Sequence, residues 1–388
     1  MSLKASTRCV RFPATADPYG AVVPPIYQTA TFRQPSASEF GEYDYTRSGN
    51  PTRTLLEQQL AELEGGAHAC AFASGMAAIT ALARILNSGD EIIAGDDLYG
   101  GTVRLCEKVL SRQAITVRYV DTTDLDAVRA AISQRTKLIL VETPGNPMLR
   151  ISDIRGLSRL ANDADVLLAV DNSMLSPILQ QPLALGADVV IHSATKFLCG
   201  HSDVMAGAVI TNDPSLHEQI AFQQNAEGAA LSPFESWLLL RGLKTLALRV
   251  EKQNESARKV AHFLRLGRKL KDVYHPGLNS HPGHDIHRSQ AEGDGSVVSF
   301  TTGDAGVSMR IVEATKLFTI TVSFGSVGST ISLPCQMSHA SIPAHLRQRI
   351  GPPADLVRIS VGIEDVNDLV ADLDQAIDIG TEGKPNSI

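Results

Sequence analysis

The stretch VVIHSATKFLCGHSD, residues 189–203, places a lysine just after a buried strand. An apolar run ends at His192, and the hydroxyl residues Ser193 and Thr195 precede Lys196. Lysine side chains usually lie on solvated surfaces, so a lysine here is partly desolvated, which lowers its pKa and favours the neutral, nucleophilic amine. The two hydroxyls can donate hydrogen bonds to a phosphate. Taken alone, the segment is equally compatible with a lysine that only caps the strand end.

Short apolar runs alternate with helical stretches on both sides of this segment. Several runs are continuously apolar, which is typical of strands buried on both faces of a sheet. The alternation predicts an α/β fold with a mainly parallel, seven-stranded sheet, and such sheets bind ligands at the carboxyl ends of their strands. The seven runs are ACAFAS (69–74), EIIAG (91–95), TVRYVD (116–121), KLILVET (137–143), VLLAVDN (166–172), DVVIHSA (188–194) and AGAVIT (206–211).

The composition along the chain predicts three parts. Residues 1–50 are rich in Pro, Thr, Tyr and Gly without a clean period, and predict an extended N-terminal arm. Residues 51–245 contain the strand–helix alternation and form the large domain. Residues 246–388 form a smaller α+β domain, reached through one long helical stretch, residues 234–266. The strand-like runs of the smaller domain are GSVVSFTT, LFTITVSF and LVRISVG.

A carboxylate ends one of the buried runs: Asp171 closes VLLAVDN, one strand–helix unit before Lys196. A buried charge needs a partner. The protonated pyridine nitrogen of a bound cofactor is such a partner, and the pairing strengthens the ring as an electron sink. The alternative is a structural aspartate that caps the following turn.

Two turns that follow strands add weaker signals. Ser74, Gly75 and Met76 open a helix, whose first backbone N–H groups and dipole favour an anion. Tyr99 lies in the glycine-rich turn DDLYGGT, where its ring can stack on a planar cofactor or simply pack on the surface. Neither a G-x-G-x-x-G fingerprint nor a Walker loop occurs, which argues against a nicotinamide dehydrogenase.

Composition and charge disfavour several other kinds of partner. The 388-residue chain has a net charge of −7, which disfavours nucleic acid. No apolar run approaches the roughly 18 residues of a membrane span, and the N-terminus does not have the pattern of a secretory signal. The five cysteines are scattered without a C-x-x-C pair, so we interpret them as reduced thiols of a cytoplasmic protein. We expect no metal site, since His281, His284 and His287 have no nearby cysteine or clear carboxylate partner.

Together these segments resemble the Cys/Met-metabolism family of fold-type I pyridoxal-phosphate enzymes, which have an aspartate-aminotransferase-like fold. The family includes the cystathionine lyases, cystathionine γ-synthase and methionine γ-lyase. The resemblance extends over essentially the whole chain, from about Ala21 to Leu373. Matching stretches, in chain order, are YDYTRSGNPTR, ASGMAA, DDLYGGT, VETPGNP, VDNSMLSP, HSATKFLCGHSD, RGLKTLALR, MSHASIP and LVRISVGIED.

The resemblance implies a role for each matching residue. Lys196 matches the lysine that holds pyridoxal 5'-phosphate as a Schiff base, and Asp171 matches the partner of the pyridine nitrogen. Tyr99 matches the tyrosine that stacks on the ring and is often proposed to take part in proton transfer. The residues that match the phosphate cradle are Ser74, Gly75, Met76, Ser193 and Thr195.

Other matches imply a shared active site and a substrate-binding group. Tyr45 and Arg47 match a pair that reaches the phosphate from the neighbouring subunit, which implies an obligate dimer, usually paired into a tetramer. The residues that match the substrate-carboxylate site are Asn146, Ser323 and Arg358, and arginine suits this task because its planar fork binds carboxylates bidentately.

Within the family, the chain most resembles the plant-type cystathionine β-lyase branch, through stretches such as SFGSVGSTISLPCQMSHASIP. The γ-acting branches typically have a glutamate where Gly328 stands, and methionine γ-lyases a cysteine where Gly101 stands. The resemblance therefore implies β-elimination of L-cystathionine to homocysteine, pyruvate and ammonia, a step of trans-sulfuration and methionine biosynthesis. The alternatives are a cystathionine γ-lyase, a cystathionine γ-synthase, an enzyme like methionine γ-lyase, and a binding protein that kept the fold without catalysis.

Overall fold

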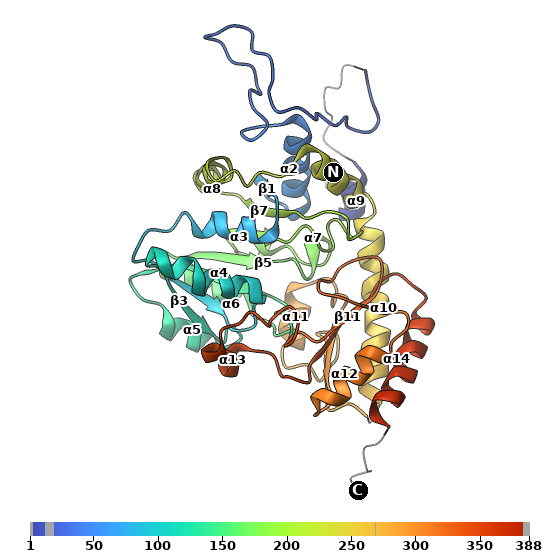
Figure 1. The fold of residues 1–388 in the computed structure, drawn as a ribbon. Helices are drawn as coiled ribbons and strands as arrows, with labels where there is room; N and C mark the ends of the chain where they lie inside the picture. Colours follow the sequence, from blue (N-terminus) through green and yellow to red (C-terminus); the bar gives the residue numbers. More distant parts are fainter. Residues whose placement is uncertain (1–2, 12–18, 268, 383–388) are drawn as a thin grey trace.

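Two β-sheets, one large and one small, organise the molecule (Figure 1). The computed structural model describes residues 3–11, 19–267 and 269–382. Within these residues, the seven-stranded sheet has the order β1-β7-β6-β5-β4-β2-β3, and the five-stranded sheet has the order β10-β11-β12-β9-β8. The strands of the large sheet are β1 His68–Phe72, β2 Glu91–Gly95, β3 Thr116–Val120, β4 Thr136–Glu142, β5 Leu167–Asp171, β6 Val189–His192 and β7 Gly207–Thr211. Those of the small sheet are β8 Asp272–Tyr274, β9 Val297–Thr301, β10 Thr319–Ile320, β11 Thr330–Ser332 and β12 Val357–Ser360.

The large sheet is mainly parallel, which confirms the predicted fold class. Strand β7 is antiparallel to its neighbours β1 and β6, whereas the other neighbouring pairs are parallel. Each of the seven apolar runs singled out in the sequence overlaps one of these strands, and only β1 and β4 begin one residue before their runs. The parallel arrangement brings Glu142, Asp171 and His192, which end β4, β5 and β6, to one edge of the sheet.

The helices lie between and around the two sheets (Figure 1). In chain order they are α1 Ala5–Val10, α2 Pro51–Glu64, α3 Gly75–Ala83, α4 Gly100–Lys108, α5 Leu125–Ala131, α6 Ile154–Asp163, α7 Ser176–Leu179, α8 Pro214–Ala226, α9 Pro233–Leu243, α10 Leu246–Leu266, α11 His284–Gln290, α12 Ala305–Ala314, α13 Ala344–Ile350 and α14 Val366–Thr381. The 3₁₀ turns are η1 Leu110–Gln113 and η2 Pro182–Leu185. None of the described helices combines the length and the hydropathy that a bilayer-spanning segment needs.

Helices cover both faces of the large sheet, which explains why its strands are continuously apolar. Ile92 and Leu140 belong to a core with residues of α3, α4 and α8, whereas their neighbours Ile93 and Ile139 belong to a core with residues of α5 and α6. Successive side chains of a strand point to opposite faces, so both sets are buried. The small sheet has its own core, which it shares with α10, α12 and α14.

Two predictions about the C-terminal part are wrong in detail. Residues 234–266 do not form one helix, because α9 ends at Leu243 and α10 begins at Leu246. The carbonyl of Gly242 accepts a hydrogen bond from Arg249 Nη2 at 2.9 Å, so a side chain takes a backbone acceptor at the break. The run LFTITVSF is a strand only over Thr319–Ile320, since the chain turns at Ser323, which has a positive φ of 88°.

The N-terminal arm is extended over most of the residues that the structure describes, but it begins with a helix. Residues 19–50 loop away from the body beside α2 and α9 (Figure 1), with an isolated bridge between Thr31 and Tyr45. Helix α1 was not expected, because six residues are too few to show a period, and Cys9 buries it against the main core. Residues 12–18, also predicted to belong to the arm, lie outside the described residues. The boundaries proposed after residues 50 and 245 remain predictions.

Candidate active site

Eleven of the thirteen predicted site residues line one cavity of about 440 Å³ at the carboxyl ends of the parallel strands. Most of its walls come from the turns that follow strands of the large sheet. The small-sheet part contributes Ser323 and Arg358 across from them. The eleven residues are Ser74, Gly75, Met76, Tyr99, Asn146, Asp171, Ser193, Thr195, Lys196, Ser323 and Arg358.

The N-terminus of α3 forms a corner of this cavity that suits an anion. Ser74 caps the helix, and its Oγ accepts the N–H of Ala77 at 3.1 Å. The first N–H groups of a helix have no acceptor within the helix, so those of Gly75 and Met76 are available to a ligand. A Cβ on Gly75 would lie 2.9 Å from Cβ of Ser193, so a larger residue would fill the corner. These donors and this space fit a phosphate group.

The two hydroxyl residues before Lys196 have different surroundings. The backbone N–H of Ser193 donates to Ser173 Oγ at 2.6 Å, which fixes the turn after β6. Thr195 Oγ1 donates to the carbonyl of Ala206 at 3.2 Å and accepts its N–H at 2.9 Å. Because Thr195 is tied to the backbone before β7, we expect Ser193 to be the more available hydroxyl for a phosphate.

Asp171 ends β5 and faces the cavity. Its Oδ1 accepts the N–H of Ser173 at 2.9 Å, and no ion pair joins it to a basic group within the described residues. Burial raises the pKa of the Asp171 carboxyl, chiefly because the charged form is desolvated. A protonated ring nitrogen would offset this cost, so Asp171 fits the pyridine nitrogen of pyridoxal phosphate.

Lys196 lies across the cavity from the small-sheet part and contacts it directly. Its Nζ donates a hydrogen bond to Ser323 Oγ and lies 4.9 Å from the centre of the Phe324 ring. Burial, reinforced by the Arg358 charge, lowers the pKa of Lys196 to about 8. A lysine with this pKa has an appreciable neutral fraction near neutral pH, so it can act as a nucleophile or base.

Ser323 is held in an unusual backbone conformation beside this amine. Its φ of 88° lies in the left-handed region, which costs about 1–3 kcal/mol for a residue other than glycine. The carbonyl of Ser323 accepts a hydrogen bond from Arg358 Nη2 at 3.0 Å, while its hydroxyl accepts from Lys196. These two contacts favour the strained turn, which places the hydroxyl inside the cavity.

Arg358 is a buried cation whose guanidinium donates hydrogen bonds to neutral oxygen atoms. It lies on β12 and is 2% exposed. Its Nη1 donates to Asn146 Oδ1 at 2.7 Å, and burial lowers the pKa of Arg358 to about 10, so it stays charged at neutral pH. Because a guanidinium binds carboxylates strongly, Arg358 and Asn146 are suited to hold the carboxylate of an amino-acid ligand.

Tyr99 lies at the mouth of the cavity, at the N-terminus of α4, and is 38% exposed. Its backbone N–H donates to Glu142 Oε2 at 3.0 Å, which ties the turn to the end of β4. A Cβ at Gly101 would lie 2.3 Å from Cε1 of the Tyr99 ring. The glycine at this position therefore leaves the ring its space.

Sequence reasoning missed Glu142, which stands beside Asp171 in the register of β4 and β5 and also lines the cavity. Burial and the neighbouring Asp171 raise the pKa of the Glu142 carboxyl well above its usual value. The signal was available, because Glu142 ends an apolar run in the same way as Asp171. Other lining residues carried no distinctive pattern, and they include Ile79, Arg104, Met205, Phe324 and Met337.

Three residues singled out in the sequence lie outside this cavity within the one chain. Tyr45 and Arg47 line a separate depression near the base of the arm, together with Arg53 and Leu231. Gly328, at the position where the γ-acting branches typically have a glutamate, is exposed and does not line the cavity.

The fold and the cavity define a class: an α/β enzyme that holds a phosphate-bearing, ring-shaped cofactor beside a desolvated lysine. A sequence model of the Cys/Met metabolism PLP-dependent enzymes matches residues 6–378. The chain belongs to this family, and its cofactor is pyridoxal 5'-phosphate.

Similar proteins with curated names support the same placement. The chain is 55% identical to a chloroplastic cystathionine β-lyase of Arabidopsis thaliana, over 96% of this chain and 80% of the relative. It is 48% identical to a cystathionine γ-lyase of Bacillus subtilis, over 92% and 95% of the two chains. A solved cystathionine γ-synthase of Xanthomonas oryzae pv. oryzae, in complex with cystathionine, superposes with a TM-score of 0.95 at 40% identity, covering 98% of this chain and 99% of that one.

Proposed function

We propose that the chain is a carbon–sulfur lyase that cleaves L-cystathionine by β-elimination to homocysteine, pyruvate and ammonia. The observation that carries this proposal is that Lys196, with a pKa near 8, faces the same cavity as the buried cation Arg358. A base and a carboxylate-binding group can therefore contact the same amino-acid ligand. The similarity to plant cystathionine β-lyase supports the choice of the β-bond.

Each residue of the cavity has a distinct task in this reaction. Arg358 and Asn146 hold the substrate carboxylate, and Lys196 Nζ removes the proton from the substrate Cα, with Tyr99 in reach of the same space. The residues that would hold the cofactor are the α3 N-terminus and Ser193 at its phosphate, Asp171 at its ring nitrogen, and Lys196 at its aldehyde carbon. Pyridoxal phosphate, when bound, is the electron sink for the negative charge that develops at Cα.

We further propose that the active site is shared between subunits of a homo-oligomer, a tetramer built from dimers. Tyr45 and Arg47 are exposed and lie apart from the cavity of their own chain, which supports a role at the phosphate of a neighbouring subunit. Residues 19–50 extend from the body of the protein, which fits contact with a second copy (Figure 1). The five free cysteines fit a reducing, cytoplasmic compartment.

Identification of the keto acid released from L-cystathionine tests the proposed reaction. We expect pyruvate together with homocysteine. Release of 2-oxobutyrate with cysteine would instead support the second candidate, a γ-lyase, which the 48% identity to the Bacillus subtilis enzyme keeps open. Cysteine-dependent consumption of an activated homoserine ester, without cleavage of cystathionine, would support a γ-synthase.

A further inference from the structure

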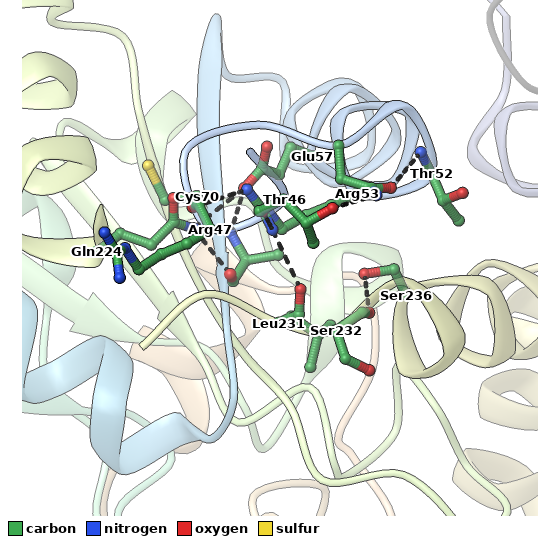
Figure 2. A network of polar contacts seen from close by, with 12 residues as sticks. Thr46, Arg47, Thr52, Arg53, Glu57, Cys70, Gln224, Leu231, Ser232 and Ser236 are labelled. Carbon is green, nitrogen blue, oxygen red and sulfur yellow. Dashed lines mark hydrogen bonds and ion pairs between the residues drawn. The ribbon is translucent and has the colours of Figure 1, made fainter. Parts of the chain in front are cut away.

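A buried arginine, Arg53, forms hydrogen bonds to the backbone of the arm turn at Thr46 and Arg47 (Figure 2). Tyr45 directly precedes these two residues. Arg53 belongs to the first turn of α2 and is 2% exposed. Its Nη1 donates to the carbonyl of Thr46 at 2.7 Å and to that of Leu231 at 3.3 Å, and its Nη2 donates to the carbonyl of Arg47 at 3.1 Å. One guanidinium thus joins the arm turn to the segment before α9.

The position of Arg53 is itself fixed from the body of the large sheet. Its Nε lies 3.8 Å from Glu57 Oε1, one helical turn along α2. The same carboxylate oxygen accepts the N–H of Ala71 in β1 at 2.8 Å and Gln224 Nε2 at 3.2 Å (Figure 2). Because β1 and α8 are parts of the rigid core, the guanidinium is a fixed point from which the arm backbone is held.

The side chain of Arg47 contrasts with its firmly held backbone. It is exposed, its Nε donates to Asn225 Oδ1 at 3.2 Å, and its guanidinium lies 5.2 Å from the centre of the Tyr45 ring. No ion pair with an acidic group is found for Arg47 within residues 3–11, 19–267 and 269–382. A cation presented in this way, on a fixed backbone and beside an aromatic residue, is ready for an anion supplied from outside the chain.

We propose that Arg53 is a positioning residue for the active site of the neighbouring subunit: it fixes the Thr46–Arg47 backbone so that Tyr45 and Arg47 meet the partner's cofactor phosphate. This inference rests on the shared active site proposed above. Ordering the turn in advance lowers the entropy lost when the phosphate binds. A lysine at this position would keep the positive charge next to Glu57 but could not bridge three carbonyls with one planar group.

The chain contains a matched comparison for Arg53. Arg249 is 4% exposed and also donates to backbone carbonyls, to that of Phe197 at 2.8 Å and to that of Gly242 at 2.9 Å. Phe197 directly follows Lys196 in the chain, so Arg249 holds the backbone beside Lys196 in the cavity of its own chain. Both arginines hold backbone carbonyls, but they are expected to affect different active sites. Arg53 should affect the active site of the neighbouring subunit, and Arg249 the active site of its own chain.

Hybrid oligomers distinguish an effect on the neighbouring active site from an effect on the active site of the same chain. Two differently tagged chains are co-expressed, and the mixed oligomers are isolated by two affinity steps. Consider a hybrid of a Lys196→Ala chain with an Arg53→Lys chain. Its only active site with a lysine takes Lys196 from the Arg53→Lys chain and the unchanged arm from the Lys196→Ala chain. We expect the Arg53→Lys homo-oligomer to bind pyridoxal phosphate about tenfold more weakly than wild type. The surviving site of the hybrid should match that of a wild-type/Lys196→Ala hybrid in the cofactor concentration that gives half-maximal activity. A hybrid of Lys196→Ala with Arg249→Lys should keep the defect of Arg249→Lys.

Two further hybrids make the outcome decisive. A hybrid of Lys196→Ala with Arg47→Ala tests the shared site itself, and its rescue is expected. If this hybrid is rescued while the Arg53→Lys hybrid is not, Arg53 acts within its own chain and only the present inference is wrong. If neither is rescued, the shared site is wrong and the inference falls with it. If Arg53→Lys has wild-type cofactor affinity, the uncharged double variant Arg53→Met/Glu57→Gln is tested next, with its folding checked by circular dichroism. This double variant must lose cofactor affinity and must be rescued in the hybrid with Lys196→Ala. Any other result overturns the inference.

Discussion

The cavity around Lys196 and the arm turn around Arg47 place reactive groups by different means. The cavity is formed where parallel strands end side by side, so Asp171 and Glu142 are neighbours because β5 and β4 are neighbours. The arm turn has no sheet to hold it and depends on a few buried side chains, among them Asn50 and Arg53. The comparison teaches that strand topology can bring most of a site together within one chain, whereas the arm residues proposed to complete a neighbour's site are held only by side-chain contacts.

The largest expected effect is on the cavity. Replacing Lys196 by alanine removes the base that faces the substrate, and we expect kcat/KM for cystathionine cleavage to fall about 10,000-fold. Borohydride reduction followed by mass spectrometry should find no cofactor adduct at this position, whereas wild type should carry one. Lys137→Ala, an exposed lysine on β4, is the control and should keep wild-type activity. Activity of Lys196→Ala within tenfold of wild type would show that another group is the base.

A smaller effect is expected at the opposite wall of the cavity. Arg358→Lys keeps the charge but loses the fork that bonds Asn146 and Ser323. We expect KM for cystathionine to rise about 30- to 100-fold, with a smaller change in kcat, because binding of the carboxylate is lost. Steady-state kinetics at saturating cofactor measures both values. An unchanged KM would mean that the substrate carboxylate is bound elsewhere.

The arm should affect the cofactor more than the substrate. Arg47→Ala removes a charged donor from the proposed phosphate site, and we expect cofactor affinity to fall about 10- to 30-fold. Equilibrium titration of the apoenzyme with pyridoxal phosphate gives the value. Arg33→Ala, another exposed arginine of the arm, should leave it unchanged. Equal losses in the two variants would point to a general effect of charge on the arm.

The smallest effect concerns stability against acid. Burial and the Arg358 charge lower the pKa of His339 to about 4, and its Nε2 donates to the carbonyl of Asn146 at 3.0 Å. Between about pH 6.5 and 4 the unfolded chain binds the proton that folded His339 does not, so stability falls as pH falls through this window and the loss is complete below it. We expect about 1–3 kcal/mol of the acid-induced loss to be absent in His339→Gln. Urea unfolding of both proteins at pH 7 and 4.5 compares them; equal losses would contradict the assignment. Residues 1–50 contain no histidine, so we expect no such effect from the arm.

The sequence by itself determined the sheet and most of the cavity. Continuous apolar runs identify strands buried on both faces, and a polar residue just after such a run lies at the ligand-binding edge, which is how Asp171 and Lys196 could be found. Glu142 obeyed the same rule and was overlooked. Helix α1 and the break between α9 and α10 could not be read from periodicity, because one is too short and the other depends on the Arg249 side chain taking backbone carbonyls.

Tertiary structure alone decided which distant residues meet. Lys196 contacts Ser323, 127 positions away in the chain, because a strained turn after β10 brings the hydroxyl to the large sheet. Arg53 reaches the carbonyl of Leu231, 178 positions away, and the carbonyls of the arm turn at once. Local patterns report burial and direction along one element, whereas contacts of this kind depend on how separate elements pack, and no local pattern contains that information.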